Sequence, residues 1–189
     1  METERLILRP FTVHDLPAIL ALFGNKQTNT FLPWFPVENL DQAREFFEER
    51  YACTNGMAWA ICKKEDNIPV GSINVKGSPP YDFGYALLPA CWHQGIATEA
   101  AAAVLAEARK RGLPYVTATH DRRNPRSGAV MKKLGMKYCY SYQEQWQPKN
   151  IPVIFRLYQM NWTTDPDCMY MKYWDEAEIR FVEDEDQGV

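Results

Sequence analysis

A short loop ahead of an alanine-rich helix carries the clearest chemical signal in this sequence. A predicted strand ends near Leu88, Trp92 to Ala97 form a loop, and a helix begins at Gly95 or Ile96. The first amides of a helix lack partners within the helix and carry partial positive charge, so a loop that turns several of them toward one point can bind a pyrophosphate. Gly95 would let the backbone approach an anion. The same pattern is also typical of an ordinary strand-to-helix turn, in which glycine is needed only for its dihedral freedom.

Two other phosphate-binding patterns are absent from the sequence. It contains no Gly-x-x-x-x-Gly-Lys-[Ser/Thr] run and no Gly-x-Gly-x-x-Gly run. Because these runs position the phosphates of hydrolysed nucleotides and of dinucleotides, nucleotide hydrolysis and dinucleotide redox chemistry are both disfavoured.

The elements that must position this loop can be read from helix starts, glycine stops and apolar patterns. Thr12 with Asp15 and Asn39 with Gln42 predict two helix starts, and Gly24 ends the first of these helices. Strands are expected over 5–9, 57–62, 69–75, 81–88, 115–119, 137–146 and 151–160, and further helices over 96–111 and from Asn124 to Gly135. An antiparallel meander followed by strand–helix–strand units predicts an α/β (α+β) fold, whose mixed, mostly antiparallel central sheet is flanked by helices, with some parallel pairing.

Chain length and composition set the outer limits. The 189 residues suit one domain, expected over 1–160, with an extension over 161–189 in which 169–174 and 179–182 could add strands and 183–186 form an acidic tail. A net charge of −3 gives no reason to expect nucleic acid or an anionic membrane as partner. No apolar run is long enough to span a bilayer, and the N-terminal residues do not form a signal peptide. Five scattered cysteines without metal spacing indicate buried thiols and a cytoplasmic protein.

Two segments carry a resemblance to a known family. Tyr85 to Pro89 with Trp92 to Ala100 resembles the acetyl-CoA motif of the GNAT N-acetyltransferase superfamily, [Gln/Arg]-x-x-Gly-x-[Gly/Ala]. Asn124 to Ser127 with Met131 to Met136 resembles that family's next block, Asn-x-x-Ser followed by a helix that ends in Leu-Gly-[Phe/Met]. Order and spacing agree over roughly residues 3–160. Trp92 at the first motif position makes the chain most similar to the branch typified by ribosomal-protein N-terminal acetyltransferases.

The resemblance implies a single-domain GNAT fold and acetyl-CoA as co-substrate, without a metal. Amides of the loop would bind the CoA pyrophosphate, and an amide of the preceding strand would polarise the thioester carbonyl. The cofactor-binding residues implied in this way are Leu87, Leu88, His93, Gln94, Gly95, Ile96, Ala97, Thr98 and Asn124.

The resemblance is weaker for the acid and the base. Many relatives protonate the leaving thiolate with a Tyr seven residues after the helix-capping Asn, but Met131 occupies that position here. Ser127 matches the serine of the similar branch and is the candidate general acid, although a first-turn serine often only satisfies backbone amides. His120 is the candidate base because of its pKa range and its place at the end of the central strand. Asp121, Glu144 or a chain of waters could serve instead.

The acceptor is the least defined part of the prediction. Trp34, Phe35 and Trp146 are candidates for a substrate pocket, although core packing explains such rings equally well. The expected reaction is acetylation of a primary amine on a small molecule or a protein N-terminus, by an enzyme that could form a homodimer. The alternative is a CoA-binding sensor of the same fold that has lost turnover.

Overall fold

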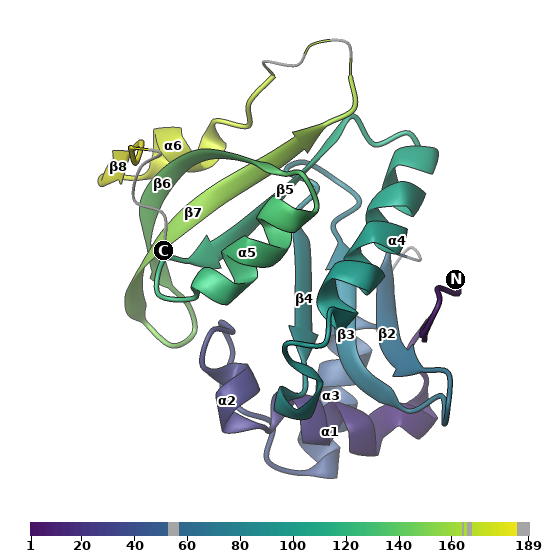
Figure 1. Cartoon of the computed structure of the whole chain (residues 1–189). Coiled ribbons are helices and arrows are strands. Elements are labelled where there is room, and N and C mark those ends of the chain that lie inside the picture. Colours follow the sequence, from purple (N-terminus) through teal and green to yellow (C-terminus); the bar gives the residue numbers. More distant parts are fainter. Residues whose placement is uncertain (53–56, 164, 166–167, 185–189) are drawn as a thin grey trace.

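The strands form two antiparallel sheets that meet along one edge (Figure 1). The computed structural model describes residues 1–52, 57–163, 165 and 168–184. The first sheet has the order β1-β2-β3-β4 and the second the order β5-β7-β6-β8. The strands are β1 (Leu6–Arg9), β2 (Ala58–Lys63), β3 (Pro69–Val75), β4 (Phe83–Leu87), β5 (Tyr115–Asp121), β6 (Lys137–Trp146), β7 (Ile151–Asn161) and β8 (Arg180–Phe181).

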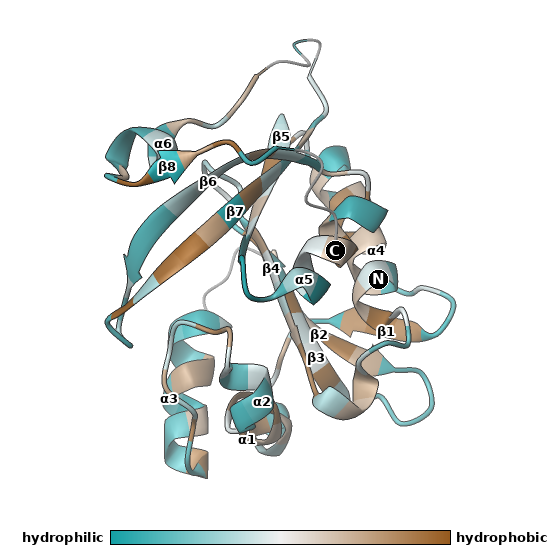
Figure 2. Cartoon of the chain, turned by 60° about the vertical axis from the view of Figure 1, so that its left-hand side comes forward, coloured by the Kyte–Doolittle hydropathy of each residue, from teal (hydrophilic) through white to brown (hydrophobic). Residues whose placement is uncertain are grey.

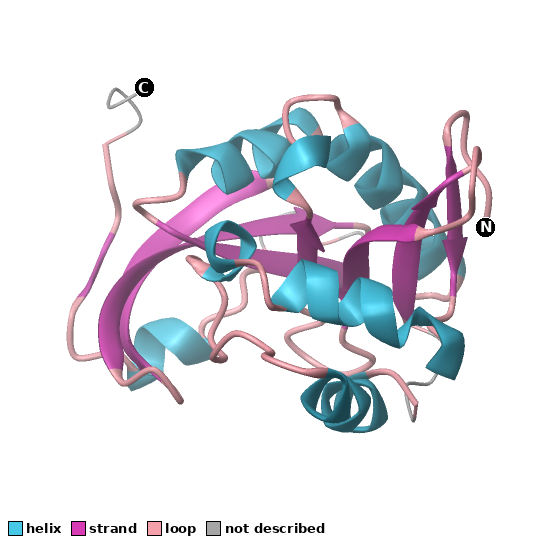
Figure 3. Ribbon diagram, turned by 90° about the horizontal axis from the view of Figure 1, so that it is seen from below, coloured by secondary structure: helices cyan, strands magenta, loops and turns pink. Residues whose placement is uncertain are grey.

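Helices cover both faces of the strand layer, as the view from below shows (Figure 3). One apolar cluster joins the first sheet to α4, and another joins the opposite face of that sheet to α1 and α3. The apolar strands β2 and β3 lie between these helices (Figure 2). The helices are α1 (Leu16–Phe23), α2 (Lys26–Asn29), α3 (Leu40–Arg50), α4 (Ile96–Lys110), α5 (Pro125–Lys133) and α6 (Lys172–Glu176), with 3₁₀ turns at Val13–Asp15 and Pro89–Cys91.

The predicted fold class is confirmed, although the strands form two antiparallel sheets instead of one mixed central sheet. Within the described residues, parallel pairing between β4 and β5 is limited to an isolated bridge from Asp82 to Thr117. Beyond this bridge no further pairing joins β4 to β5 among the described residues, and the two strands belong to different sheets. This separation leaves a gap between the sheets, and the amides of β4 that face this gap have no neighbouring strand.

The segment after β7 differs from its prediction in one part and agrees in another. Residues 169–174 and 179–182 were both possible strands; Lys172–Glu176 instead form α6, whereas Arg180–Phe181 do form a strand that pairs with β6. Tyr140 donates a hydrogen bond from its hydroxyl to the Tyr170 carbonyl at 2.6 Å. The Glu183 carboxylate accepts bonds from Ser141 at 3.0 Å and from Arg156, so this first residue of the predicted acidic tail is held on the sheet.

The start of α1 is stabilised by a half-buried ion pair. The Asp15 carboxylate accepts bonds from the Thr12 amide at 2.8 Å and its hydroxyl at 3.0 Å, which confirms the predicted capping box. Arg9 adds two bonds of 2.8 Å to the same carboxylate. Burial raises the pKa of Asp15, but the bonds from Arg9 and Thr12 outweigh it, and the pKa lies below its usual 3.8.

Substitution of Asp15 by Asn should lower the free energy of unfolding at pH 7 by about 2 kcal/mol. Because the folded-state pKa is depressed, the carboxylate stabilises the fold fully above pH 3.8 and loses this contribution as the pH falls through the lowered value. Urea unfolding of both proteins at pH 7 and at acid pH would check this. The difference should shrink in acid, and a difference independent of pH would contradict the assignment.

Candidate active site

A large cleft of about 1020 Å³ lies where the two sheets diverge. It is bounded by β4, the loop after it, the start of α5, the concave side of β6 and the segment between α1 and α3. Most of the predicted site residues line it: Trp34, Leu87, His93, Gly95, Ile96, Ala97, Thr98, His120, Asn124, Ser127 and Trp146. The structure does not bring Phe35, Leu88 or Gln94 to its wall.

The loop between β4 and α4 is held in a tightly turned conformation. His93 and Gly95 both have positive φ, at 60° and 76°, and Gly95 is the N-cap of α4. Gln94 is fixed from two sides, because its side chain donates to the Ala90 carbonyl at 2.7 Å and its own carbonyl accepts from Arg5 at 2.9 Å. Gln94 could therefore contribute only its backbone amide to a ligand. The first-turn amides of α4 open toward the cleft with a partial positive charge, as an anion requires.

The backbone of β4 distinguishes the two leucines proposed for the thioester. The Leu88 amide donates to the Val70 carbonyl at 2.9 Å. In the same register residues 86 and 84 lie opposite Ser72 and Asn74, so they too direct their amides toward β3. Hydrogen-bonding direction alternates along a strand, so the amides of Leu87 and Tyr85 point away from β3 into the gap. The Leu87 carbonyl points the same way and accepts from Trp92 Nε1 at 2.9 Å. Leu87 therefore fits the predicted role, whereas the Leu88 amide is already used by the sheet.

Ser127 in the first turn of α5 is paired with a residue that the sequence prediction missed. Its Oγ lies 3.0 Å from the hydroxyl of Tyr85, which also donates to the Ser127 carbonyl at 3.3 Å. Burial raises the pKa of Tyr85 to about 12, although the bond to Ser127 lowers it, so the phenol stays protonated at neutral pH. The pair thus presents hydroxyl protons beside the gap between β4 and β5. Asn124, the N-cap of α5, makes no side-chain capping bond and lines the same cleft.

His120 is buried near the same point, with only one of its ring nitrogens bonded. Its Nδ1 lies 2.8 Å from the Asp121 carbonyl, while Nε2 has no hydrogen-bond partner among the described residues. The ring packs so closely on α5 that a Cβ at Gly128 would come within 2.5 Å of Nε2. Burial lowers the pKa of His120, so the ring is neutral at pH 7. Asp121 is engaged by Arg123, whose NH2 group lies 2.8 Å from its carboxylate.

Of the three aromatic residues proposed for the acceptor pocket, two face the cleft. The Arg50 guanidinium lies 4.2 Å from the Trp34 ring centroid, and Trp146 packs edge-on against Phe155 at 5.2 Å. Phe35 is 63% exposed and lies outside the cleft wall. The physical reason is local: between Pro33 and Pro36 the chain turns Trp34 inward onto Phe46, and its neighbour consequently points outward.

Buried polar atoms without partners are concentrated among the residues of this cleft. Four such side-chain atoms occur in the part of the chain that the structure describes, and three belong to cleft residues: Trp34 Nε1, Asp82 Oδ1 and His120 Nε2. Leaving a buried polar atom unpaired costs free energy, so native proteins keep few of them. Their concentration in one cleft is expected where a ligand completes the bonding.

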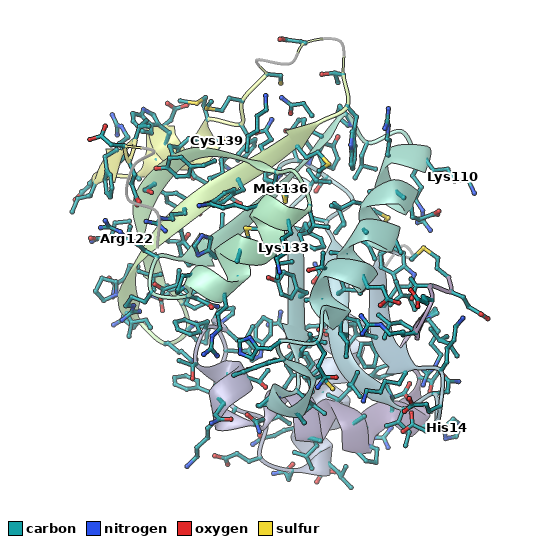
Figure 4. The ribbon with its side chains drawn as sticks, in the orientation of Figure 1. His14, Lys110, Arg122, Lys133, Met136 and Cys139 are labelled. Atoms are coloured by element: carbon teal, nitrogen blue, oxygen red, sulfur yellow. The ribbon has the colours of Figure 1, made fainter. Side chains whose placement is uncertain are left out.

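A shallower groove continues from the cleft between α4 and α5. It measures about 690 Å³, shares Thr98 and Lys133 with the cleft, and is lined further by Arg109 and Lys110. Figure 4 marks Lys133 on α5 and Lys110 near the end of α4. Small side chains at Ala102 and Ala106 leave its floor open. The groove therefore offers a cationic extension of the loop site on the outer side of the molecule.

Neither a metal site nor a membrane-spanning helix is present among the described residues. No group of three or more His, Cys, Asp or Glu side chains there is arranged to hold a metal ion. None of the helices in the described ranges is both long and apolar enough to cross a membrane.

Comparison with known proteins places the chain in a family. Residues 5–137 match the acetyltransferase (GNAT) domain. The uncharacterized N-acetyltransferase YoaA of Bacillus subtilis is 27% identical over 145 residues, covering 72% of this chain and 82% of that protein. A GNAT-family acetyltransferase structure from Bacillus anthracis is similar with a TM-score of 0.76 at 23% identity, covering 85% and 97% of the two chains. A structure named "putative ribosomal-protein-serine acetyltransferase", from Vibrio cholerae, has a TM-score of 0.71 at 17% identity, with 85% and 95% covered.

The protein belongs to the GNAT acetyltransferase family and is an acetyltransferase. The family uses acetyl-CoA as co-substrate, and the observed fold of antiparallel sheets flanked by helices is that of its solved members.

Proposed function

We propose that the protein transfers an acetyl group directly from acetyl-CoA to a primary amine, carried by a small molecule or a protein N-terminus. The observation that carries this proposal is the gap between β4 and β5. There the amides of Leu87 and Tyr85 point at one space, and the Tyr85–Ser127 hydroxyl pair borders it. In the attack of an amine on a thioester, the amides can stabilise the charge on the carbonyl oxygen and the protonated hydroxyl can protonate the leaving sulfur.

In this proposal the donor binds from the outer side of the molecule. The amides from His93 to Thr98 hold the pyrophosphate of CoA, and the cationic groove between α4 and α5 holds the phosphate group of CoA that lies outside the pyrophosphate. The pantetheine arm then lies along the open edge of β4. The thioester carbonyl accepts from the Tyr85 or Leu87 amide, which stabilises the negative charge that develops on its oxygen.

The chemistry needs no acyl-enzyme. A neutral amine attacks the thioester carbon, a C–N bond forms, and the C–S bond breaks as the electron pair leaves with sulfur. The departing thiolate takes a proton from the Tyr85–Ser127 pair, the new ammonium gives up its proton to water or to a base in the cleft, and a proton from solvent restores the pair. His120 is one candidate base, since it is neutral and its Nε2 is unpaired.

Replacing Lys133 with Ala should raise the KM for acetyl-CoA by about fivefold while kcat stays close to wild type, because an exposed lysine–phosphate contact contributes up to about 1 kcal/mol. The effect should weaken as salt is added. Lys132, exposed on the same turn but outside both the cleft and the groove, is the matched control. Equal KM values for Lys133→Ala and Lys132→Ala would contradict the groove assignment.

The branch assignment is part of the same proposal. It rests on Trp92 at the first motif position, on Ser127, and on the likeness to the Vibrio cholerae structure with its ribosomal-protein-serine name. A protein N-terminus would need access from the side of α2 and the β6–β7 hairpin. There Lys149 donates two bonds of 2.8 Å to Asn29 and joins the two halves of the molecule (Figure 1).

The test is thiol release from acetyl-CoA with a panel of amines and N-terminal peptides, combined with mass detection of the acetylated product. Turnover with at least one acceptor is expected. Tight CoA binding without turnover across a broad panel would contradict the proposal and favour a CoA-binding sensor.

A further inference from the structure

The part of the cleft formed by β6 and α6, away from the loop between β4 and α4 (the phosphate loop of the proposed function), is both acidic and aromatic. Along β6, alternate side chains Tyr142, Glu144 and Trp146 line the cleft, whereas Gln143 and Gln145 between them do not. Tyr173 of α6 stacks on Tyr142, with ring centroids 5.1 Å apart and planes 17° from parallel. A carboxylate therefore stands between aromatic rings on the concave side of the second sheet.

Asp82, immediately before β4, faces this acidic and aromatic end. Side chains alternate along β4: Phe83 and Leu87 pack in the cluster beneath α4, whereas Ala86 packs in the cluster beneath α1 and α3. Asp82 lies four residues before Ala86, so the two side chains are on the same face of the strand. The side chain of Asp82 therefore points away from α4 and from the proposed cofactor site. Asp82 forms an ion pair with Lys76, whose Nζ lies 3.9 Å from Oδ2.

Asp82 is only partly neutralised within the protein. The side chain of Lys76 is 59% exposed, that of Asp82 is 26% exposed, and Asp82 Oδ1 is buried without a hydrogen-bond partner among the described residues. Burial raises the pKa of Asp82 to about 6, with Lys76 lowering it and Glu144 raising it. Burial likewise raises the pKa of Glu144, while Lys76 lowers it. Glu144 thus disfavours the charged form of Asp82, burial disfavours the charged form of both carboxylates, and a cation between them would relieve this cost.

The three arginines that line the cleft each contact a group other than Asp82 or Glu144. Arg50 lies over Trp34, Arg123 pairs with Asp121, and Arg126 lies 5.9 Å from the Trp92 ring beside the phosphate loop. Arg126 therefore places positive charge beside the loop, whereas at the other end of the cleft the two carboxylates of Asp82 and Glu144 outnumber the single cation Lys76. This polarity suits an anionic donor at one side and a positively charged acceptor at the other.

We propose that the acceptor is a cationic amine, whose second positive group is held by Asp82 and Glu144 between the rings of Tyr142, Tyr173 and Trp146. Carboxylates supply the opposite charge, and the faces of the aromatic rings attract an ammonium once water is displaced. This inference rests on the proposed function, because it assigns the site to the acceptor of that reaction. It favours a diamine-like small molecule, or a peptide with a basic residue near its N-terminus, over a neutral or acidic acceptor.

The test compares two amines of the same size that differ in one charge. In 4-(aminomethyl)benzylamine both ends are ammonium groups, and in 4-ethylbenzylamine a methyl group replaces one of them. Calorimetric titration of the protein saturated with CoA should show at least tenfold tighter binding of the diamine. Binding of 4-(aminomethyl)benzoate, which places a carboxylate at the same end, should be weaker than that of either amine. Equal affinities for the two amines would overturn the proposal.

Variants of the two carboxylates test whether they cause the preference for the diamine. Asp82→Asn and Glu144→Gln keep the side-chain shape, and each should reduce the preference for the diamine to about threefold or less while CoA affinity is unchanged. Glu48→Gln, on the exposed side of α3, is the charge-matched control and should keep the full preference. Should Asp82→Asn fail to fold, Glu144→Gln decides the result. A preference that survives in every folded variant would overturn the assignment to these carboxylates.

The binding measurement separates this proposal from the proposed function. Selective diamine binding without thiol release would contradict acetyl transfer and leave the cation site intact. Thiol release with equal kcat/KM for the two amines would support acetyl transfer and contradict the cation site.

Discussion

Replacement of Gly95 by Val should raise the dissociation constant for CoA at least about 100-fold in a chain that still folds. Gly95 has a φ of 76°, a conformation that strains any other residue by roughly 1–3 kcal/mol and β-branched ones most. The space beside it is not the obstacle to folding, since a Cβ would first meet Arg5 at 3.5 Å. Relief of the strain would instead rotate the neighbouring peptides and turn the amides of the loop away from the pyrophosphate.

A matched control is available at the other end of the same helix. Gly112 has a φ of 81° and a Cβ there would meet nothing within 4 Å, so Gly112→Val imposes the same backbone strain away from the loop. Thermal unfolding should show similar losses of stability in the two variants, whereas calorimetry should show wild-type CoA affinity only in Gly112→Val. Unchanged CoA affinity in folded Gly95→Val would remove the loop from the cofactor site.

Elements with local signals were predicted correctly from the sequence. The start of α4 at Ile96 and the start of α5 at Pro125 follow from Gly95 and from the Asn124–Pro125 pair, whose effects act within one helical turn. The alternation on β6 could also have indicated a second site, since Tyr142, Glu144 and Trp146 recur at every second residue. In the sequence Glu144 stood out only as a possible base, because its neighbours across the cleft were unknown.

Features that depend on distant contacts could not be predicted. Tyr85 and Ser127 lie 42 residues apart, and their pairing requires knowledge of which face of β4 is turned toward α5. Asp82 acquires its role only where β4 and β5 meet, and no neighbouring residue in the chain indicates this. The amides of Leu87 and Leu88 point in opposite directions, and the direction of each is fixed by the register with β3.

Replacing Ser127 with Ala should lower kcat about 100-fold, with little change in CoA affinity. When Tyr85 donates its proton to Ser127 Oγ, the serine hydroxyl keeps its own proton for the departing sulfur, and Tyr85 acts by positioning it. Tyr85→Phe should consequently lower kcat less, by about tenfold. Ser78→Ala, in an exposed turn outside the cleft, should behave as wild type.

The double variant decides whether the two hydroxyls act as one unit. If Tyr85 works only through Ser127, then Tyr85→Phe combined with Ser127→Ala should be no slower than Ser127→Ala alone. Single-turnover thiol release with acetyl-CoA and an amine saturating would measure the chemical step directly. Additive losses would mean that each hydroxyl contributes separately, and a larger loss for Tyr85→Phe than for Ser127→Ala would make the phenol the proton donor.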